Sequence, residues 1–155
     1  MHTNEAIEGD KELLRARVIR RLRQVMNLGK RYDVKVLIEN VGLRTKNNVL
    51  FALLDIFPQA GALLDTGHAH VNGWDIPAVV KALGERLAAC HVHDNDGNGD
   101  AHLPVGQGDI DWKAYFGAVK KYAPQATQVF EYCCGFNNTK DLEAHIAELK
   151  EDYKL

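Results

Sequence analysis

Four short hydrophobic runs in this sequence each end in a side chain that can bind a divalent metal. The four residues are Glu39, Asp65, His91 and Glu131. Three carboxylates with one imidazole suit Mn²⁺, our preferred candidate, or Mg²⁺ and Co²⁺, and further histidines shift the choice toward Zn²⁺. Polar residues that directly follow aliphatic strands gather where parallel strands stop and a cleft opens. The pattern therefore predicts one metal centre built from four strand ends.

The spacing of these residues fits one strand and one helix per interval. The intervals are 26, 26 and 40 positions, against roughly 31 per unit when about 250 residues form eight strand–helix units. Side chains alternate between the faces of a strand, so each candidate shares a face with the residue two positions earlier. Those residues are all apolar, as an inward core layer requires: Leu37, Leu63, Ala89 and Val129.

Further polar side chains lie close to these four in the sequence, and we expect them around the same centre. They are His68, His93, Asp100 and His102. The segment from Asp94 to Gly99 also matches the first half of an EF-hand loop. Val105 stands at the twelfth position, where calcium needs a bidentate carboxylate, and a strand rather than a helix precedes the loop. Calcium binding is therefore not expected there.

The elements that must position these residues follow from hydrophobic periodicity and from turn and capping signals. An amphipathic helix precedes four strand–helix units, and this alternation implies a parallel sheet. We expect strands at about 34–38, 61–64, 87–93 and 127–132, and helices at about 10–30, 48–56, 75–83, 109–122 and from 138 to the C-terminus.

Four strands are too few to close a barrel, and an open parallel sheet normally needs cover on both faces. Either the chain is half of a longer barrel, or two chains pair to complete one. A flavodoxin-like open sheet is a third option, but it explains a metal-binding residue at every strand end less well.

Composition predicts a single domain over residues 1–155 and limits its partners. Hydrophobic residues make up 46% and charged residues 26%, which is ordinary for a globular protein. The net charge is −2, and the dispersed basic residues argue against a nucleic-acid partner. We find no apolar stretch of about 18 residues and no leader, so neither a membrane partner nor secretion is expected. Three cysteines without a disulfide framework favour the cytoplasm.

Taken together, these motifs resemble the xylose isomerase-like TIM barrel superfamily. The matching segments are Glu39-Asn40-Val41-Gly42, Asp65-Thr66-Gly67-His68, His91-Val92-His93-Asp94-Asn95, the loop from Asp100 to Trp112, and Phe130-Glu131. The superfamily includes sugar isomerases and epimerases, inosose dehydratases and apurinic endonuclease family 2 enzymes. The loop is most similar to that of the sugar phosphate isomerase/epimerase branch. The resemblance covers nearly the whole chain after the first helix, and only the second half of a family barrel.

The resemblance implies a divalent-metal-dependent sugar isomerase or epimerase, with dehydratase chemistry as a close neighbour. Glu39, Asp65, His91 and Glu131 match the family's ligands to one metal. The two glutamates would also transfer a proton at the carbon next to a carbonyl that the metal binds. His68 matches a residue that touches substrate oxygen, and we expect His93, Asp100 and His102 to contact the small sugar or sugar-phosphate substrate as well. The small number of strands, rather than the resemblance, leads us to expect a homodimer that completes the half-barrel.

Two alternatives remain open. Asp100, His102 and His68 also match additional metal ligands of the apurinic endonucleases, which suggests a metal-dependent phosphodiesterase. Histidines that those enzymes draw from earlier strands are absent here, as is an arginine that ketose epimerases often carry after the third ligand, where Gly97 lies nearby. The second alternative is a catalytically silent half-barrel that retains the metal site.

Overall fold

A parallel sheet forms the centre of the fold. The computed structural model describes residues 11–41 and 49–154, and four strands among them pair in the order β1-β2-β3-β4. Their bounds are Leu37–Glu39, Gly61–Asp65, Leu87–Val92 and Thr127–Phe130. The predicted parallel α/β architecture is confirmed. In the pairing register, Asp65 stands directly beside His91.

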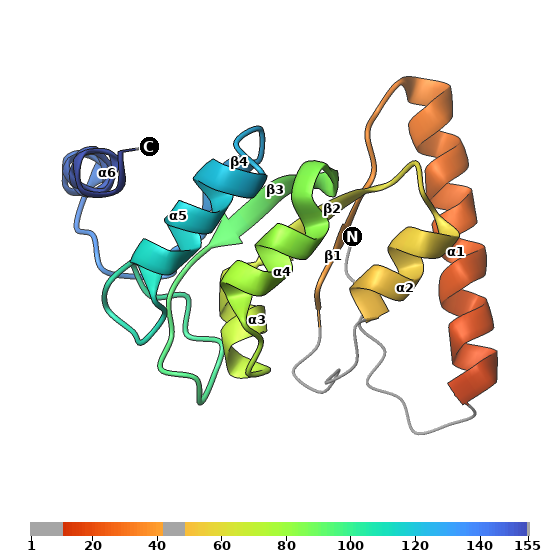
Figure 1. The fold of residues 1–155 in the computed structure, drawn as a ribbon, viewed down its shortest axis with the longest axis horizontal. Helices are drawn as coiled ribbons and strands as arrows, with labels where there is room; N and C mark the ends of the chain where they lie inside the picture. Colours follow the sequence, from red (N-terminus) through yellow and green to blue (C-terminus); the bar gives the residue numbers. More distant parts are fainter. Residues whose placement is uncertain (1–10, 42–48, 155) are drawn as a thin grey trace.

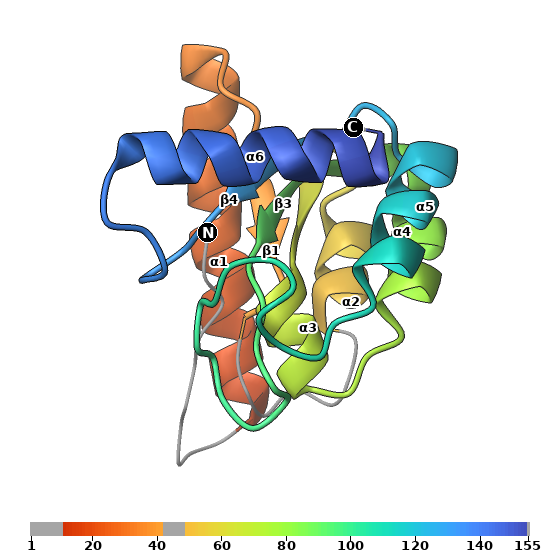
Figure 2. The same ribbon diagram turned by 90° about the vertical axis from the view of Figure 1, so that its left-hand side faces the viewer.

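Helices follow the strands in the predicted alternation (Figure 1). Helices α2, α4 and α5 lie on one side of the sheet, as two perpendicular views show (Figures 1 and 2). Asp75, Asp111 and Asn138 cap α4, α5 and α6 by accepting backbone N–H groups, as N-cap residues do. The bounds are Lys11–Tyr32 for α1, Val49–Ile56 for α2, Thr66–Val71 for α3, Ile76–Leu83 for α4, Trp112–Tyr122 for α5 and Thr139–Tyr153 for α6.

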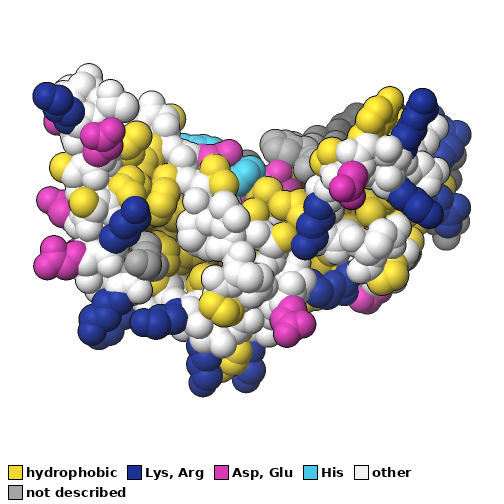
Figure 3. Space-filling model, turned by 90° about the horizontal axis from the view of Figure 1, so that it is seen from above, with side chains coloured by type: hydrophobic (Ala, Val, Ile, Leu, Met, Phe, Trp, Pro, Cys, Tyr) yellow, Lys and Arg dark blue, Asp and Glu magenta, His cyan; other side chains and the backbone are white. Residues whose placement is uncertain are grey.

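The two faces of the sheet differ in burial. The residues that alternate with the candidate ligands form the main core and are fully buried: Ile38, Ala62, Leu64, Cys90 and Val92. On the opposite face, Leu63 and Ala89 are buried, whereas Val129 is 42% exposed. Figure 3 shows a hollowed surface with histidine and acidic side chains visible inside it. The described residues therefore have the form of a half-barrel whose inner face is exposed at β4.

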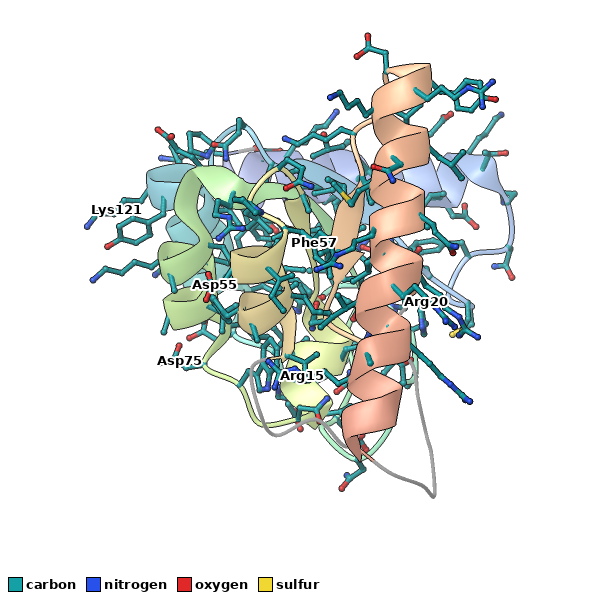
Figure 4. All side chains as sticks on the ribbon, turned by 90° about the vertical axis from the view of Figure 1, so that its right-hand side faces the viewer. Arg15, Arg20, Asp55, Phe57, Asp75 and Lys121 are labelled. Carbon is teal, nitrogen blue, oxygen red and sulfur yellow. The ribbon has the colours of Figure 1, made fainter. Side chains whose placement is uncertain are left out.

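The long helix α1 faces the core through one stripe. Leu22 and Met26 are buried, whereas the arginines of this helix, including Arg15 and Arg20 (Figure 4), are exposed. Helix α2 ends before Phe57, which is buried in the core (Figure 4) and precedes Pro58. None of the helices in the described ranges is both long enough and apolar enough to cross a bilayer.

Two details of the predicted elements were wrong. Helix α3 was not expected, because its residues Thr66–Val71 are small or polar and show no apolar periodicity. Strand β1 begins at Leu37, three positions later than predicted. Val34 instead donates its N–H to the carbonyl of Gly29 and is 61% exposed, so it belongs to the turn after α1.

Candidate metal centre

The four predicted ligands converge at the C-terminal ends of the strands. Glu39 and Asp65 are the last residues of β1 and β2, His91 lies near the end of β3, and Glu131 directly follows β4. The Nδ1 atom of His91 is their common point. It lies 3.3 Å from Glu39 Oε1, 3.8 Å from Asp65 Oδ2 and 3.3 Å from Glu131 Oε2.

This donor set fits a divalent cation. In each of two overlapping triads, one ligand atom per residue lies within 4.8 Å of the others. The triads are Glu39/Asp65/His68 and Asp65/His91/Glu131. Adjacent ligand atoms around a cation with bonds of about 2.1 Å are about 3 Å apart, close to the observed spacing. The carboxylate oxygens within each triad lie within 4.8 Å of one another, and such groups repel unless a positive charge lies between them.

Asp65 is held in place by several hydrogen bonds. Its Oδ1 accepts the backbone N–H of His68 at 2.7 Å, and His93 Nε2 lies 3.0 and 3.1 Å from its two oxygens. The side-chain amide of Asn40 also bridges to the backbone of Asp65 in both directions. Burial opposes ionisation, but the hydrogen bond and charge of His93, with a contribution from His68, outweigh it and lower the pKa of Asp65. The side chain is therefore a carboxylate at neutral pH.

The two glutamates reach the centre from opposite sides. Glu39 is on β1 and Glu131 follows β4, and these are the outer strands of the sheet formed by the described residues. Their exposure differs, since Glu39 is 3% and Glu131 is 36% exposed. A molecule bound at the centre would thus have a buried carboxylate on one side and an accessible carboxylate on the other.

A second group of polar atoms gathers around Asp100. Its Oδ2 lies 3.2 Å from His68 Nε2 and 3.4 Å from His102 Nε2. The Nδ1 atoms of both histidines face backbone carbonyls, of Asn40 at 3.1 Å and of Glu131 at 2.9 Å. A carbonyl can only accept, so each Nδ1 donates, and each neutral ring then directs the lone pair of Nε2 toward the carboxylate. These atoms require a proton or a cation between them.

His93 occupies a different position from the other three predicted substrate-binding residues. The side chains of His68, Asp100 and His102 are partly exposed, at 13%, 27% and 31%. His93 is fully buried and stacks on the ring of His102, with a centroid distance of 3.8 Å. Substrate contact therefore remains a prediction for the three exposed residues, and the burial of His93 favours another role.

The loop that carries Asp100 and His102 is closed by Asp94. This buried carboxylate accepts the backbone N–H groups of Asn95, Gly106 and Ile110 and the indole N–H of Trp112. Both oxygens are thereby occupied by donors. Asp94 also pairs with Leu103 through two backbone hydrogen bonds, so the two ends of the loop are fixed together.

Several residues that support the centre were missed from the sequence. Asn40 bridges to the backbone of Asp65, Asp94 closes the loop after β3, and Thr66 hydrogen-bonds to the backbone of His91 and His93. Their sequence position could have predicted a supporting role, because each lies directly beside or close after a predicted ligand at a strand end. Polar residues at such places commonly orient the ligands.

Comparison with known sequences identifies relatives over part of the chain. The uncharacterized protein MJ1614 of Methanocaldococcus jannaschii is 30% identical over 109 residues, which cover 67% of this chain and 42% of that protein. The uncharacterized protein MJ1311 of the same organism is 30% identical over 101 residues, or 59% of this chain and 34% of that protein. The matches thus cover less than half of these relatives.

Comparison with solved structures identifies the fold. A D-allulose 3-epimerase from Methylomonas sp. superimposes with a TM-score of 0.78 at 19% identity, covering 97% of this chain and 59% of that chain. A D-tagatose 3-epimerase-like protein superimposes with a TM-score of 0.67 at 23% identity, covering 90% and 54%. This chain therefore corresponds to about half of each barrel.

The family assignment rests on nearly the full length of the sequence. The family model described as xylose isomerase-like TIM barrel matches residues 1–151. This match agrees with the strand order and with the position of the polar cluster at the strand ends. The chain therefore belongs to the xylose isomerase-like TIM barrel family.

Proposed function

We propose that this protein is a divalent-metal-dependent isomerase or epimerase of a small sugar or sugar phosphate. The observation that carries the proposal is the convergence of three carboxylates on His91. Oxygens of Glu39, Asp65 and Glu131 lie 3.3–3.8 Å from its Nδ1 atom. The donor set suits Mn²⁺ best among common divalent ions, with Mg²⁺, Co²⁺ and Zn²⁺ as alternatives. The sugar epimerases among the structures of similar fold support the same class of reaction.

The two glutamates would act as the acid–base pair. A proton next to a carbonyl is hard to remove because the resulting enediolate concentrates negative charge on oxygen. A bound divalent cation would supply Lewis-acid stabilisation of that charge. Glu39 and Glu131 come from the two outer strands, so one carboxylate could remove the proton from one face while the other returns it to the opposite face. Such general acid–base action typically contributes about 10²–10⁴-fold.

The experiment is proton exchange in D₂O with D-allulose, D-tagatose or L-ribulose and Mn²⁺. NMR would follow the loss of the hydrogen next to the carbonyl and the appearance of the epimer. We expect Glu131→Gln to lower both rates by about 10²–10⁴-fold without unfolding the chain. Glu143→Gln on the exposed surface of α6 makes the same chemical change away from the centre and should leave both rates unchanged. Full activity of Glu131→Gln would refute the assignment.

A second candidate is a metal-dependent phosphodiesterase of the abasic-site endonuclease type. The observation in its favour is the group formed by Asp100, His68 and His102, in which Asp100 Oδ2 lies 3.2 Å and 3.4 Å from the Nε2 atoms of the two histidines. The net charge of −2 argues against a DNA substrate. Metal analysis showing three zinc ions per site, together with cleavage of abasic DNA, would favour phosphodiesterase activity over the proposed isomerase or epimerase activity.

We also propose that a second copy of the chain completes the barrel. Strands β1 and β4 lie at the edges of the described sheet, and an uncovered edge exposes unpaired N–H and C=O groups. Val129 on the inner face is 42% exposed, although it occupies a position that a closed barrel would cover. A protein that binds the metal but shows no proton exchange with any sugar would instead be a catalytically silent half-barrel.

A further inference from the structure

We propose that His93 is a positioning residue that holds Asp65 in its ligating orientation. This inference rests on the proposed metal centre and assigns to His93 a role other than contact with substrate. His93 lies directly after β3, two positions beyond His91, and is fully buried. A side chain without exposed surface cannot meet a substrate unless the loop above it moves.

The contact between His93 and Asp65 fixes one edge of the carboxylate. His93 Nε2 lies 3.0 Å from Oδ1 and 3.1 Å from Oδ2. An ionised carboxylate only accepts, so Nε2 carries the hydrogen and donates it. The backbone N–H of His68 occupies Oδ1 from another direction. The Oδ2 atom also lies 3.5 Å from His68 Nδ1 and 3.8 Å from His91 Nδ1, on the side of the proposed metal centre.

The ring of His93 is itself locked in place from several sides. Gly67 lies against it so closely that a Cβ atom at position 67 would overlap the imidazole. The ring of His102 covers it in a parallel stack with an interplanar angle of 5°. The hydroxyl of Thr66 donates to the backbone carbonyl of His93 and accepts from its N–H. Thr66 and Gly67, which directly follow Asp65, therefore contact His93 and hold it in the position from which it orients Asp65.

The remaining ring nitrogen distinguishes a positioning role from direct ligation. His93 Nδ1 is buried and has no hydrogen-bond partner among the described residues. The nearest acidic atom given for it is Asp100 Oδ1, at 3.8 Å. If His93 bound a cation directly, it would do so through this atom. One ligand atom each from His93, Asp100 and His102 lies within 4.8 Å of the others, so direct ligation would use this nitrogen together with those two residues, whereas the positioning role uses Nε2.

The test measures Mn²⁺ binding to the metal-free protein by titration calorimetry, with thermal unfolding of the same samples. His93→Leu removes the donor and keeps an apolar side chain in the cavity. His93→Gln places an amide N–H near the position of Nε2. Loss of such an outer contact typically weakens metal binding about 10–100-fold, so we expect this loss for His93→Leu and a return to within a few-fold of wild type for His93→Gln. His145→Leu, a histidine on α6 that contacts Tyr132, should bind like wild type.

The outcomes separate this inference from the proposed function. If the wild-type protein does not bind Mn²⁺, the metal centre itself is wrong. If wild type binds and His93→Leu binds equally well, the centre stands and the positioning role is refuted. If His93→Gln binds as weakly as His93→Leu while its metal-free form remains folded, His93 acts through its second nitrogen, which also overturns the positioning role.

Discussion

At the scale of single residues, the centre combines chemistry that can be read from the sequence with contacts that cannot. The types and spacing of Glu39, Asp65, His91 and Glu131 predicted that they would meet, and the structure brings them together. The burial of His93 was not predictable. His91 and His93 are two positions apart, so the sequence assigns them to the same face of the strand. Only the packing against Gly67 and His102 shows which imidazole is covered.

The tight approach of Gly67 to His93 leads to a prediction. Gly67→Ala would place a methyl group within the volume of the imidazole, so the ring or the start of α3 must move. Such overpacking typically costs about 1–3 kcal/mol, and we expect that decrease in the free energy of unfolding, measured with urea. Gly99→Ala is the matched control, because an added methyl group there meets nothing within 4 Å. Equal stability of the two variants would contradict the packing described.

At the scale of elements, the helices and strands were largely predictable because each carries a clear pattern. Alternation of apolar runs, Pro58 after α2 and the capping residues Asp75 and Asp111 marked the boundaries. Helix α3 was not predicted because its residues Thr66–Val71 show no apolar periodicity, although Asp65 caps it locally by accepting the backbone N–H of His68. The loop after β3 was expected, but its closure by Asp94 was not, since nothing in local sequence shows which aspartate is buried.

Asp94 provides a test of that closure. Asp94→Asn would turn an amide N–H₂ toward N–H donors that now share two carboxylate oxygens, including Trp112 Nε1 at 2.7 Å. A buried donor without an acceptor costs about 1–3 kcal/mol. We expect lower stability and faster hydrogen exchange at the amides of Gly106 and Ile110. Asp96→Asn, at an exposed position in the same loop, should behave like wild type, and identical exchange in both variants would show that Asp94 does not hold the loop.

At the scale of the whole molecule, the half-barrel raises the question of what covers its inner face. The α/β class and the parallel order of the strands could be predicted from the sequence. What covers the exposed side of the sheet could not, because apolar strand residues look the same whether one chain or two close the core. The hollow in Figure 3 lies where the polar cluster gathers. A complete substrate pocket therefore requires walls from outside the described residues.

Association can be measured directly. Two copies that pair β4 of one with β1 of the other would leave no open edge in an eight-stranded assembly. Size-exclusion chromatography with light scattering should then give a mass of twice 17.3 kDa. Val129→Asp, which places a charge on the exposed inner face of β4, should shift the protein toward the monomer. A wild-type protein that stays at 17.3 kDa at all concentrations would rule out the proposed homodimer.

The central claim is that four side chains from four strand ends hold one cation, and anomalous diffraction from a crystal soaked in Mn²⁺ tests it most directly. We predict a strong anomalous peak at about 2.0–2.3 Å from oxygens of Glu39, Asp65 and Glu131 and from a nitrogen of His91. A peak that lies elsewhere, or a soaked crystal without manganese at this position, would contradict the claim and the proposed chemistry that depends on it.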